Sequence, residues 1–297
     1  MKNIKFILIA CCATPFGLLP LSWSQEIGRY LGRLMITVNK KRRHIALCNL
    51  KACFPEQTEA QHQLLLSKVV AEAGKWFMES AYVWFRRPDY LVQRTFVKNP
   101  QVLKAAFEKG RGVVIVLPHL GNWEILNFYV PQNYPFGAMY KPIKSNLMED
   151  IIFKGRSRVG TSMFSANTQG VRKAFKHLRN GNVLAILSDH LPSAKAGVYA
   201  PFFGINAYTG KLTHALIKHN QSEVLMATVL RKSKGQGFEI EFHAVDQMDT
   251  QDSIEAASNV NNAIEKVIRR TPEQYQWFYK RFSGQPDGIK TIYQQGN

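Results

Sequence analysis

Acidic residues are scarce in this chain of 297 residues, in which 21 Asp and Glu stand against 39 Lys and Arg and leave a formal net charge of +18. Such a charge attracts polyanions of any kind, so nucleic acid, anionic lipid and an acidic carrier protein are all candidate partners. The chain has no recognisable nucleic-acid-binding module, which argues against nucleic acid. It also lacks internal repeats, low-complexity tracts and a credible linker. We therefore expect one main domain, for which 45% hydrophobic residues provide a substantial core.

Cysteine is also rare. The four cysteines, Cys11, Cys12, Cys48 and Cys53, form no CxxC pair, and no histidines stand at zinc-finger spacing. We therefore expect no metal site. All four are interpreted as reduced thiols in a cytosolic redox environment.

The longest apolar run, FILIACCATPFGLLPLSW, covers residues 6–23 and follows two lysines. It approaches the length of a bilayer span, although two prolines and a glycine would interrupt a regular helix. A cleaved signal peptide would need a small-residue cleavage site, and none is convincing. We favour a transmembrane or half-inserted helical anchor at residues 1–24 over a buried first helix. A single catalytic domain is then expected at residues 25–297.

Four positive charges in a row, Lys40 to Arg43, follow on a predicted helix. Such a run is often only a solvated helix face. Next to an apolar anchor it favours contact with anionic headgroups, to which each charge contributes roughly 1 kcal/mol of attraction. Residues 57–108 are predicted to be mainly helical, and their aromatic residues are expected to form core, the wall of an apolar groove, or a membrane contact.

The chain is organised around residues 111–124, RGVVIVLPHLGNWE. Val113 to Leu117 is a continuous apolar run rich in β-branched residues, which predicts a buried central strand of a parallel sheet. Pro118 cannot donate to a strand ladder and ends the strand. Gly121 allows the backbone to turn into a short helix.

Strands and helices alternate from residue 112 onward. The predicted strands cover residues 113–117, 136–140, 183–187, 223–230 and 238–245. The predicted helices cover residues 123–130, 147–158, 169–178, 211–219, 253–270 and 272–282. This alternation predicts an α/β fold with a mostly parallel central sheet flanked by helices, in which the last two strands are antiparallel.

His119 and Glu124 are the candidate catalytic pair, because they lie between a strand's carboxyl end and a helix's amino end, where open α/β sheets bind ligands. Asn122 is the candidate N-cap of that helix. A histidine that takes a proton from a hydroxyl needs a carboxylate on its other ring nitrogen, and Glu124 is the expected one. No serine or cysteine adjoins the pair, so we expect a hydroxyl to attack an acyl carbon directly. The alternative is structural, with His119 bonded to a loop carbonyl and Glu124 solvated.

The segment HLGNWE resembles the HxxxxE/D motif of the late lipid A acyltransferases, the lauroyl and myristoyl transferases. Further segments agree with that family in the same order, from about residue 30 to 286. They are Asn49-Leu50, Cys53–Glu56, Tyr140–Pro142, Arg156, Asp189, Pro201–Gly204, Pro272–Trp277 and Arg281-Phe282.

The resemblance implies transfer of a fatty acyl chain from an acyl carrier protein thioester to a hydroxyl of a phosphorylated lipid A precursor. It places the enzyme at the cytoplasmic side of a bacterial inner membrane. No dissociable cofactor is expected, because the thioester carries its own activation. Two rivals remain open: an HxxxxE/D acyltransferase that uses acyl-CoA on glycerol phosphate or another glycolipid, and a thioesterase.

The resemblance also implies further site residues. Arg156 is expected to polarise the thioester carbonyl or hold a phosphate, although it also suits the end of a helix dipole. Asp189 closes a predicted strand, so it is expected to meet His119 at one sheet edge; such acids also often cap loops. Lys141 stands where the family more often has arginine, and His190 where it more often has glutamine.

The loop over residues 190–210 is rich in glycine and proline and contains Phe202 and Phe203. One hypothesis is a lid that covers an acyl chain. The other is a structured loop whose two phenylalanines are fixed in the core.

Overall fold

The computed structural model describes residues 18–142, 146–245, 248, 250–286 and 289–294. Its helices are α2 (Leu21–Val38), α3 (Lys40–Cys53), α4 (Glu59–Phe85), α5 (Pro88–Val92), α6 (Pro100–Glu108), α7 (Leu126–Tyr129), α8 (Asn146–Ser157), α9 (Thr168–Arg179), α10 (Leu212–Asn220) and α11 (Ser253–Arg270). Short 3-10 turns are η1 (Trp123–Ile125), η2 (Val130–Gln132), η3 (Ser233–Gly235) and η4 (Pro272–Gln274). The strands are β1 (Thr95–Val97), β2 (Val113–Leu117), β3 (Phe136–Tyr140), β4 (Ser162–Ser165), β5 (Val183–Leu187), β6 (Gly197–Phe202), β7 (Ile205–Gly210), β8 (Glu223–Arg231) and β9 (Phe238–Ala244).

Seven strands form one sheet in the order β1-β9-β8-β2-β5-β3-β4. Every neighbouring pair is parallel except β8 and β9, which are antiparallel. The expected α/β fold with a mostly parallel sheet and an antiparallel last pair is therefore confirmed. The strands β6 and β7 form a separate antiparallel hairpin.

The central strand β2 is buried along its whole length, as a continuous apolar run requires. Val114 and Val116 face one hydrophobic cluster, whereas Ile115 and Leu117 face the other. On one side β2 pairs in register with β5, so that Leu117 lies opposite Leu187. Residues that follow β2 and β5 therefore emerge at the same edge of the sheet.

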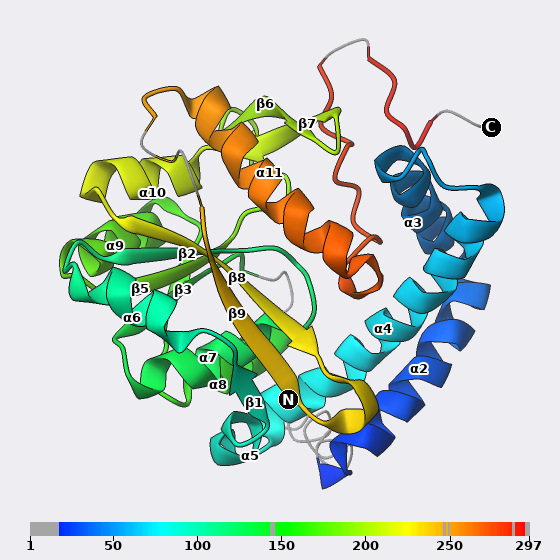
Figure 1. The fold of residues 1–297 in the computed structure, drawn as a ribbon, viewed down its shortest axis with the longest axis horizontal. Coiled ribbons are helices and arrows are strands. Elements are labelled where there is room, and N and C mark those ends of the chain that lie inside the picture. The colour runs from blue at the N-terminus through cyan, green and yellow to red at the C-terminus, as the bar shows by residue number, and fades with distance from the viewer. Residues whose placement is uncertain (1–17, 143–145, 246–247, 249, 287–288, 295–297) are drawn as a thin grey trace.

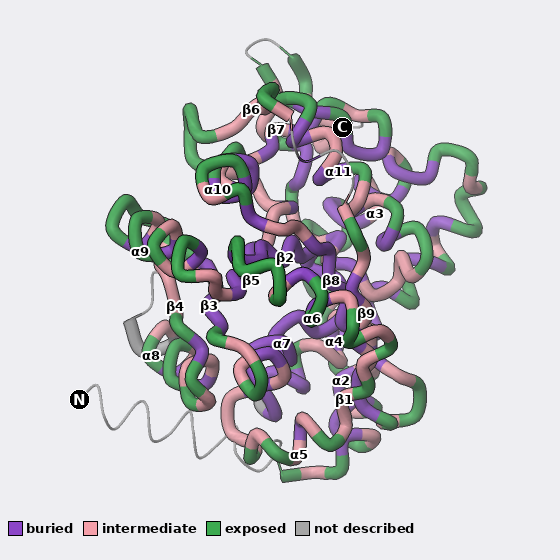
Figure 2. Tube along the Cα trace, turned by 60° about the vertical axis from the view of Figure 1, so that its left-hand side comes forward, coloured by how far each residue is buried: buried purple, intermediate pink, exposed green. Residues whose placement is uncertain are grey.

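Helices cover both faces of the sheet, and Figure 1 shows α9, α10 and α11 on one side and α6, α7 and α8 on the other. The core strands are buried and the outer turns of the helices are exposed (Figure 2). The helix α4 runs past the end of the sheet and contributes to both clusters, with Val69 in one and Tyr82 in the other.

Three glycines bring the backbones of α2 and α4 into contact. A Cβ atom on Gly28 would lie 2.6 Å from the Gly74 carbonyl oxygen, and one on Gly32 would lie 2.3 Å from the carbonyl oxygen of Val70. Side chains at these positions would force the helices apart, so α2 and α4 pack as one unit.

The structure corrects one prediction and adds detail in the loop over residues 190–210. Residues 272–282 form only the turn η4 followed by irregular backbone, so the predicted final helix is wrong. Residues 197–210 form the β6–β7 hairpin, which was not predicted. Phe202 and Phe203 are buried in the core, which supports the fixed loop over the lid.

The predicted anchor lies mostly outside the described residues, and the predicted boundary after residue 24 falls inside α2. Within the described part of the chain, no helix combines the length and apolar character that crossing a membrane requires.

Candidate active site

The site is built on the turn that follows β2. Gly121 adopts a φ of +65°, and a Cβ atom there would lie 1.8 Å from the carbonyl oxygen of Val229, so only glycine fits. The Gly121 N–H donates to the Gln274 carbonyl at 3.0 Å, and the Asn122 N–H donates to the Val229 carbonyl at 2.8 Å. The turn is therefore held between β8 and the segment after α11.

His119 is 9% exposed and is held by both oxygens of Asp189. Its Nδ1 lies 2.6 Å from Asp189 Oδ1, and its backbone N–H donates to Asp189 Oδ2 at 2.7 Å. A carboxylate only accepts hydrogen bonds, so Nδ1 carries the proton and Nε2 presents a lone pair. The predicted meeting of His119 and Asp189 at one sheet edge is confirmed.

Asp189 is suited to this role because it stays ionised. Burial by itself would raise the pKa of its carboxyl, but the charge of His119 and two hydrogen bonds from that residue outweigh burial and hold the pKa below its usual range. The carboxylate therefore fixes the histidine tautomer and stabilises an imidazolium when one forms.

Glu124 does not orient His119, and this part of the predicted pair is wrong. Glu124 accepts from Arg156 Nε at 2.7 Å and also from Arg156 Nη2, and its third contact is Asn127 Nδ2 at 3.3 Å. Among the described residues no hydrogen bond or ion pair joins Glu124 to His119. A 3-10 turn that begins at residue 123 directs the glutamate to α8, where it forms an ion pair with Arg156.

Arg156 is thus brought close to the same turn, while its predicted role in polarising the thioester carbonyl or holding a phosphate stays a prediction. Burial tends to lower the pKa of its guanidinium, but the charge and hydrogen bonds of Glu124 outweigh this and raise the pKa. Its side chain is 19% exposed, so the guanidinium keeps some contact with the surface.

Asn122 is not the helix N-cap that was predicted, whereas the role of Lys141 as a substrate-binding residue stays a prediction. Asn122 makes no side-chain cap; its Nδ2 donates to Glu79 Oε2 at 2.9 Å, and its buried Oδ1 has no partner among the described residues. Lys141 is exposed just after β3, close enough for its charge to lower the pKa of His190.

His190 and Tyr279 were not predicted as site residues. The His190 ring stacks on His119, with centroids 3.6 Å apart and planes at 8°, and its other face stacks on Tyr279 at 3.8 Å. Burial, supported by the charge of His119, lowers the pKa of His190 to about 3. The ring is therefore neutral near pH 7. A departure from the family pattern was the one sequence signal at His190.

His119, Asp189 and His190 are also the group of metal-ligating side chains that the described residues bring together, with ligand atoms within 4.8 Å of one another. The two stacked imidazoles keep their lone pairs in nearly parallel planes, whereas a metal ion requires lone pairs that converge. The arrangement suits proton transfer better than metal binding.

A mainly apolar cavity of about 390 Å³ lies beside the turn, between α2, α4 and the segment after α11. Its lining includes Gly121, Trp76, Phe77 and Tyr279. Trp76 stacks on Trp123 with centroids 5.3 Å apart, and the Trp123 ring lies edge-on to His119 at 4.8 Å. His119 is not part of the lining itself; the contacts through Trp123 and Trp76 connect its ring to the cavity wall, to which α4 contributes.

The remaining signature residues hold the carboxyl-terminal segment over the turn. Asn49 Nδ2 donates to the carbonyl oxygens of Trp277 and Tyr279, at 2.6 and 2.9 Å. Arg281 donates to the Tyr208 carbonyl and to Thr209 Oγ1, both at 2.7 Å, and so fixes the β6–β7 hairpin.

Comparison with known proteins identifies the family. The profile of the family described as bacterial lipid A biosynthesis acyltransferase matches residues 2–283. The lipid A biosynthesis palmitoleoyltransferase of Escherichia coli K12 is 29% identical over 269 residues, which cover 90% of this chain and 87% of that protein. The lauroyltransferase of the same organism is 26% identical over 277 residues (93% and 90%), and its myristoyltransferase is 22% identical over 259 residues (86% and 78%). The chain belongs to the bacterial lipid A biosynthesis acyltransferase family.

Proposed function

We propose that this enzyme transfers a fatty acyl chain from an acyl carrier protein thioester to a hydroxyl of a lipid A precursor, at the cytoplasmic face of a bacterial inner membrane. The observation that carries the proposal is the orientation of His119, whose Nδ1 is bonded to an ionised carboxylate and whose Nε2 keeps a lone pair. The acceptor and the acyl chemistry follow from the relatives, which are named as lipid A lauroyl-, myristoyl- and palmitoleoyltransferases.

In the proposed reaction, Nε2 of His119 removes the proton of the acceptor hydroxyl while its oxygen attacks the thioester carbon. The negative charge moves to the carbonyl oxygen, and in this scheme Arg156, which Glu124 holds, stabilises it. Collapse of this intermediate breaks the carbon–sulfur bond. The imidazolium then returns the proton to the departing sulfur, while Asp189 remains ionised throughout. The thioester supplies the activation, so the scheme uses no dissociable cofactor.

The cavity beside the turn is the proposed site of the acyl chain. It is mainly apolar, and each methylene that leaves water there contributes about 0.8 kcal/mol. Met35 and Arg42 also line it, so it reaches the surface next to the basic row Lys40–Arg43. Those charges suit the phosphates of a glycolipid and an acidic carrier protein.

The exposed face of α2 is the proposed membrane contact. Large apolar side chains lie exposed along one stripe of this helix, among them Trp23, Tyr30, Leu34 and Val38. The adjacent row Lys40–Arg43 complements an anionic headgroup layer. With this face on the bilayer, a lipid acceptor reaches the cavity from the membrane side.

Vesicle binding tests the membrane contact. The double variant Leu34→Gln/Val38→Gln should bind vesicles of phosphatidylethanolamine and phosphatidylglycerol at least tenfold more weakly than the unmodified chain. Ile254→Gln on α11 is the matched control, since Ile254 is also half exposed and α11 lies apart from α2 (Figure 1). Equal binding by all three proteins would disprove the contact.

The reaction itself is tested with purified enzyme and separate donors and acceptors. Acyl carrier protein thioester and a lipid A precursor should give an acylated glycolipid by mass spectrometry, and His119→Ala should abolish it while the melting temperature stays near normal. Activity with acyl-CoA and glycerol phosphate instead would favour the first rival. Free fatty acid released without an acceptor would identify a thioesterase.

A further inference from the structure

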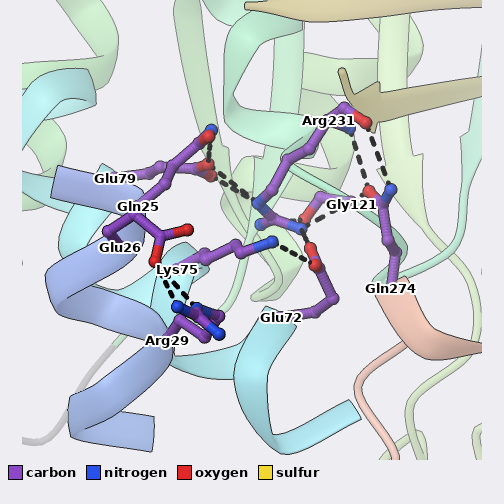
Figure 3. Close-up of polar contacts among 9 residues, drawn as sticks. All are labelled: Gln25, Glu26, Arg29, Glu72, Lys75, Glu79, Gly121, Arg231 and Gln274. Atoms are coloured by element: carbon purple, nitrogen blue, oxygen red, sulfur yellow. Dashed lines mark hydrogen bonds and ion pairs between the residues drawn. The ribbon is translucent and has the colours of Figure 1, made fainter. Parts of the chain in front are cut away.

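Two buried charges take no part in the proposed reaction. Glu79 on α4 is fully buried, and the side chain of Arg231, the last residue of β8, is 3% exposed. Arg231 Nε lies 2.9 and 2.8 Å from the two carboxylate oxygens of Glu79 (Figure 3). Glu79 and Arg231 are 152 positions apart in the chain. Gln25 on α2 also donates to Glu79 at 2.8 Å, and Arg231 Nη1 lies 3.6 Å from Glu72 on α4.

Several further hydrogen bonds join this pair to the turn that carries His119. Arg231 Nη2 donates to the Gly121 carbonyl at 3.0 Å, and Asn122 Nδ2 donates to Glu79 at 2.9 Å. The Arg231 N–H donates to Gln274 Oε1 at 2.9 Å, and the carbonyl of the same glutamine accepts from the Gly121 N–H. Figure 3 shows Glu79, Gly121 and Gln274 around the guanidinium.

Stability alone does not account for such a pair. Removing two charges from water is costly, and hydrophobic residues of similar volume are often as stabilising or more so. Burial raises the pKa of Glu79 although the charge of Arg231 acts to lower it, so the cost of removing this carboxylate from water is present here. What hydrophobic residues could not do is hold a carbonyl and a carboxylate in one fixed plane, as the guanidinium fork does.

We propose that Arg231 is a positioning residue of the acyl transfer: clamped by Glu79, it fixes the Gly121 carbonyl and thereby the backbone that presents His119. The inference rests on the proposed function. It assigns Arg231 no contact with the substrate. A displacement of the turn by a fraction of an ångström would move Nε2 away from the acceptor hydroxyl, and misplacement by about 1 Å costs on the order of 10²-fold in rate.

The main test is Arg231→Lys. Lysine keeps the charge but is a single point donor, so it reaches Glu79 or the Gly121 carbonyl and not both. We expect kcat for acyl transfer to fall about 10- to 100-fold while the KM values for donor and acceptor change less than threefold. Arg158→Met is the matched control, because it removes another partly buried arginine. Arg158 donates to the Val83 carbonyl at 2.8 Å and makes no hydrogen bond to the turn among the described residues. That variant should keep kcat within twofold.

The charge-neutral double variant Arg231→Met/Glu79→Gln covers the case in which Arg231→Lys does not fold. It leaves no unpaired buried charge, yet lacks the bond to the Gly121 carbonyl, and should show the same loss of kcat. A folded Arg231 variant with kcat within twofold of the unmodified enzyme would overturn the proposal.

Hydrogen exchange gives a readout that does not depend on the reaction. Loss of the clamp should speed amide exchange in a peptide over residues 117–125 at least tenfold, with little change in peptides from β3 or α9. Exchange that rises evenly over the chain would mean a merely structural role and would also overturn the proposal. An unmodified enzyme that transfers no acyl group would instead refute the proposed function, and the exchange data would still decide whether Arg231 fixes the turn.

Discussion

Replacing Asp189 by asparagine should remove the general base without removing the histidine. Asp189 accepts two hydrogen bonds from His119, one from the backbone N–H at 2.7 Å and one from Nδ1 at 2.6 Å. Asparagine has nearly the same shape but only one oxygen, and its amide group donates. It therefore satisfies only one of the two donors that it faces.

The backbone N–H cannot lose its proton, whereas the imidazole can change tautomer. The asparagine oxygen should therefore face the backbone, and its amide group should face Nδ1. That contact forces the ring proton onto Nε2, where the lone pair is needed. We expect kcat to fall on the order of 10³- to 10⁴-fold, equivalent to about 4–5.5 kcal/mol of transition-state stabilisation.

The assay is single-turnover acyl transfer, combined with ¹⁵N NMR of the histidine side chains to identify the tautomer. Glu124→Gln is the control, because it weakens the pairing with Arg156 and leaves the bonds of His119 unchanged. Asp189→Asn should therefore change the tautomer of His119, and Glu124→Gln should not. Transfer by Asp189→Asn within tenfold of the unmodified rate, or a tautomer change in Glu124→Gln alone, would refute this assignment.

Two further predictions concern stability. Gly121→Ala should lower the free energy of unfolding by about 2–6 kcal/mol, because it combines backbone strain with a Cβ placed 1.8 Å from the Val229 carbonyl oxygen. The control is Gly160→Ala, which has a positive φ but open space around its Cβ and should lose only the strain energy. Equal losses for the two variants in urea unfolding would contradict this reasoning. The pKa of His190 is about 3 in the folded chain, against 6.5 ordinarily, so between these pH values the unfolded chain binds a proton on His190 that the folded chain does not. The free energy of unfolding therefore falls by up to about 1.4 kcal/mol per pH unit as the pH drops from 6.5 toward 3. His190→Gln should flatten that slope in urea titrations at pH 4.5–6.5, and an unchanged slope would show that His190 does not titrate in this way.

The sheet was predictable because its signals are local. The strands β2, β3 and β5 have the predicted bounds, since each is a short apolar run that ends at proline, lysine-proline or a polar pair. Once β2 and β5 are taken as parallel neighbours, the meeting of His119 and Asp189 follows from strand register. That part of the site is encoded by residues close in sequence to strand ends.

The errors arise where distant residues decide the conformation. Residues 272–282 have a pattern that suits a helix, but the backbone of this segment bonds instead to Gly121, His119 and Asn49. Glu124 is five residues after His119, yet its partner is set by the position of α8. The pairing of Glu79 with Arg231 has no local signal at all.

The segment that covers the turn has a consequence for folding. Gly121 and His119 bond through their backbones to Gln274 and Gln276. Contacts between residues so far apart in the chain require a long loop to close first, so they form late. The turn should therefore reach its final conformation in one of the last steps of folding.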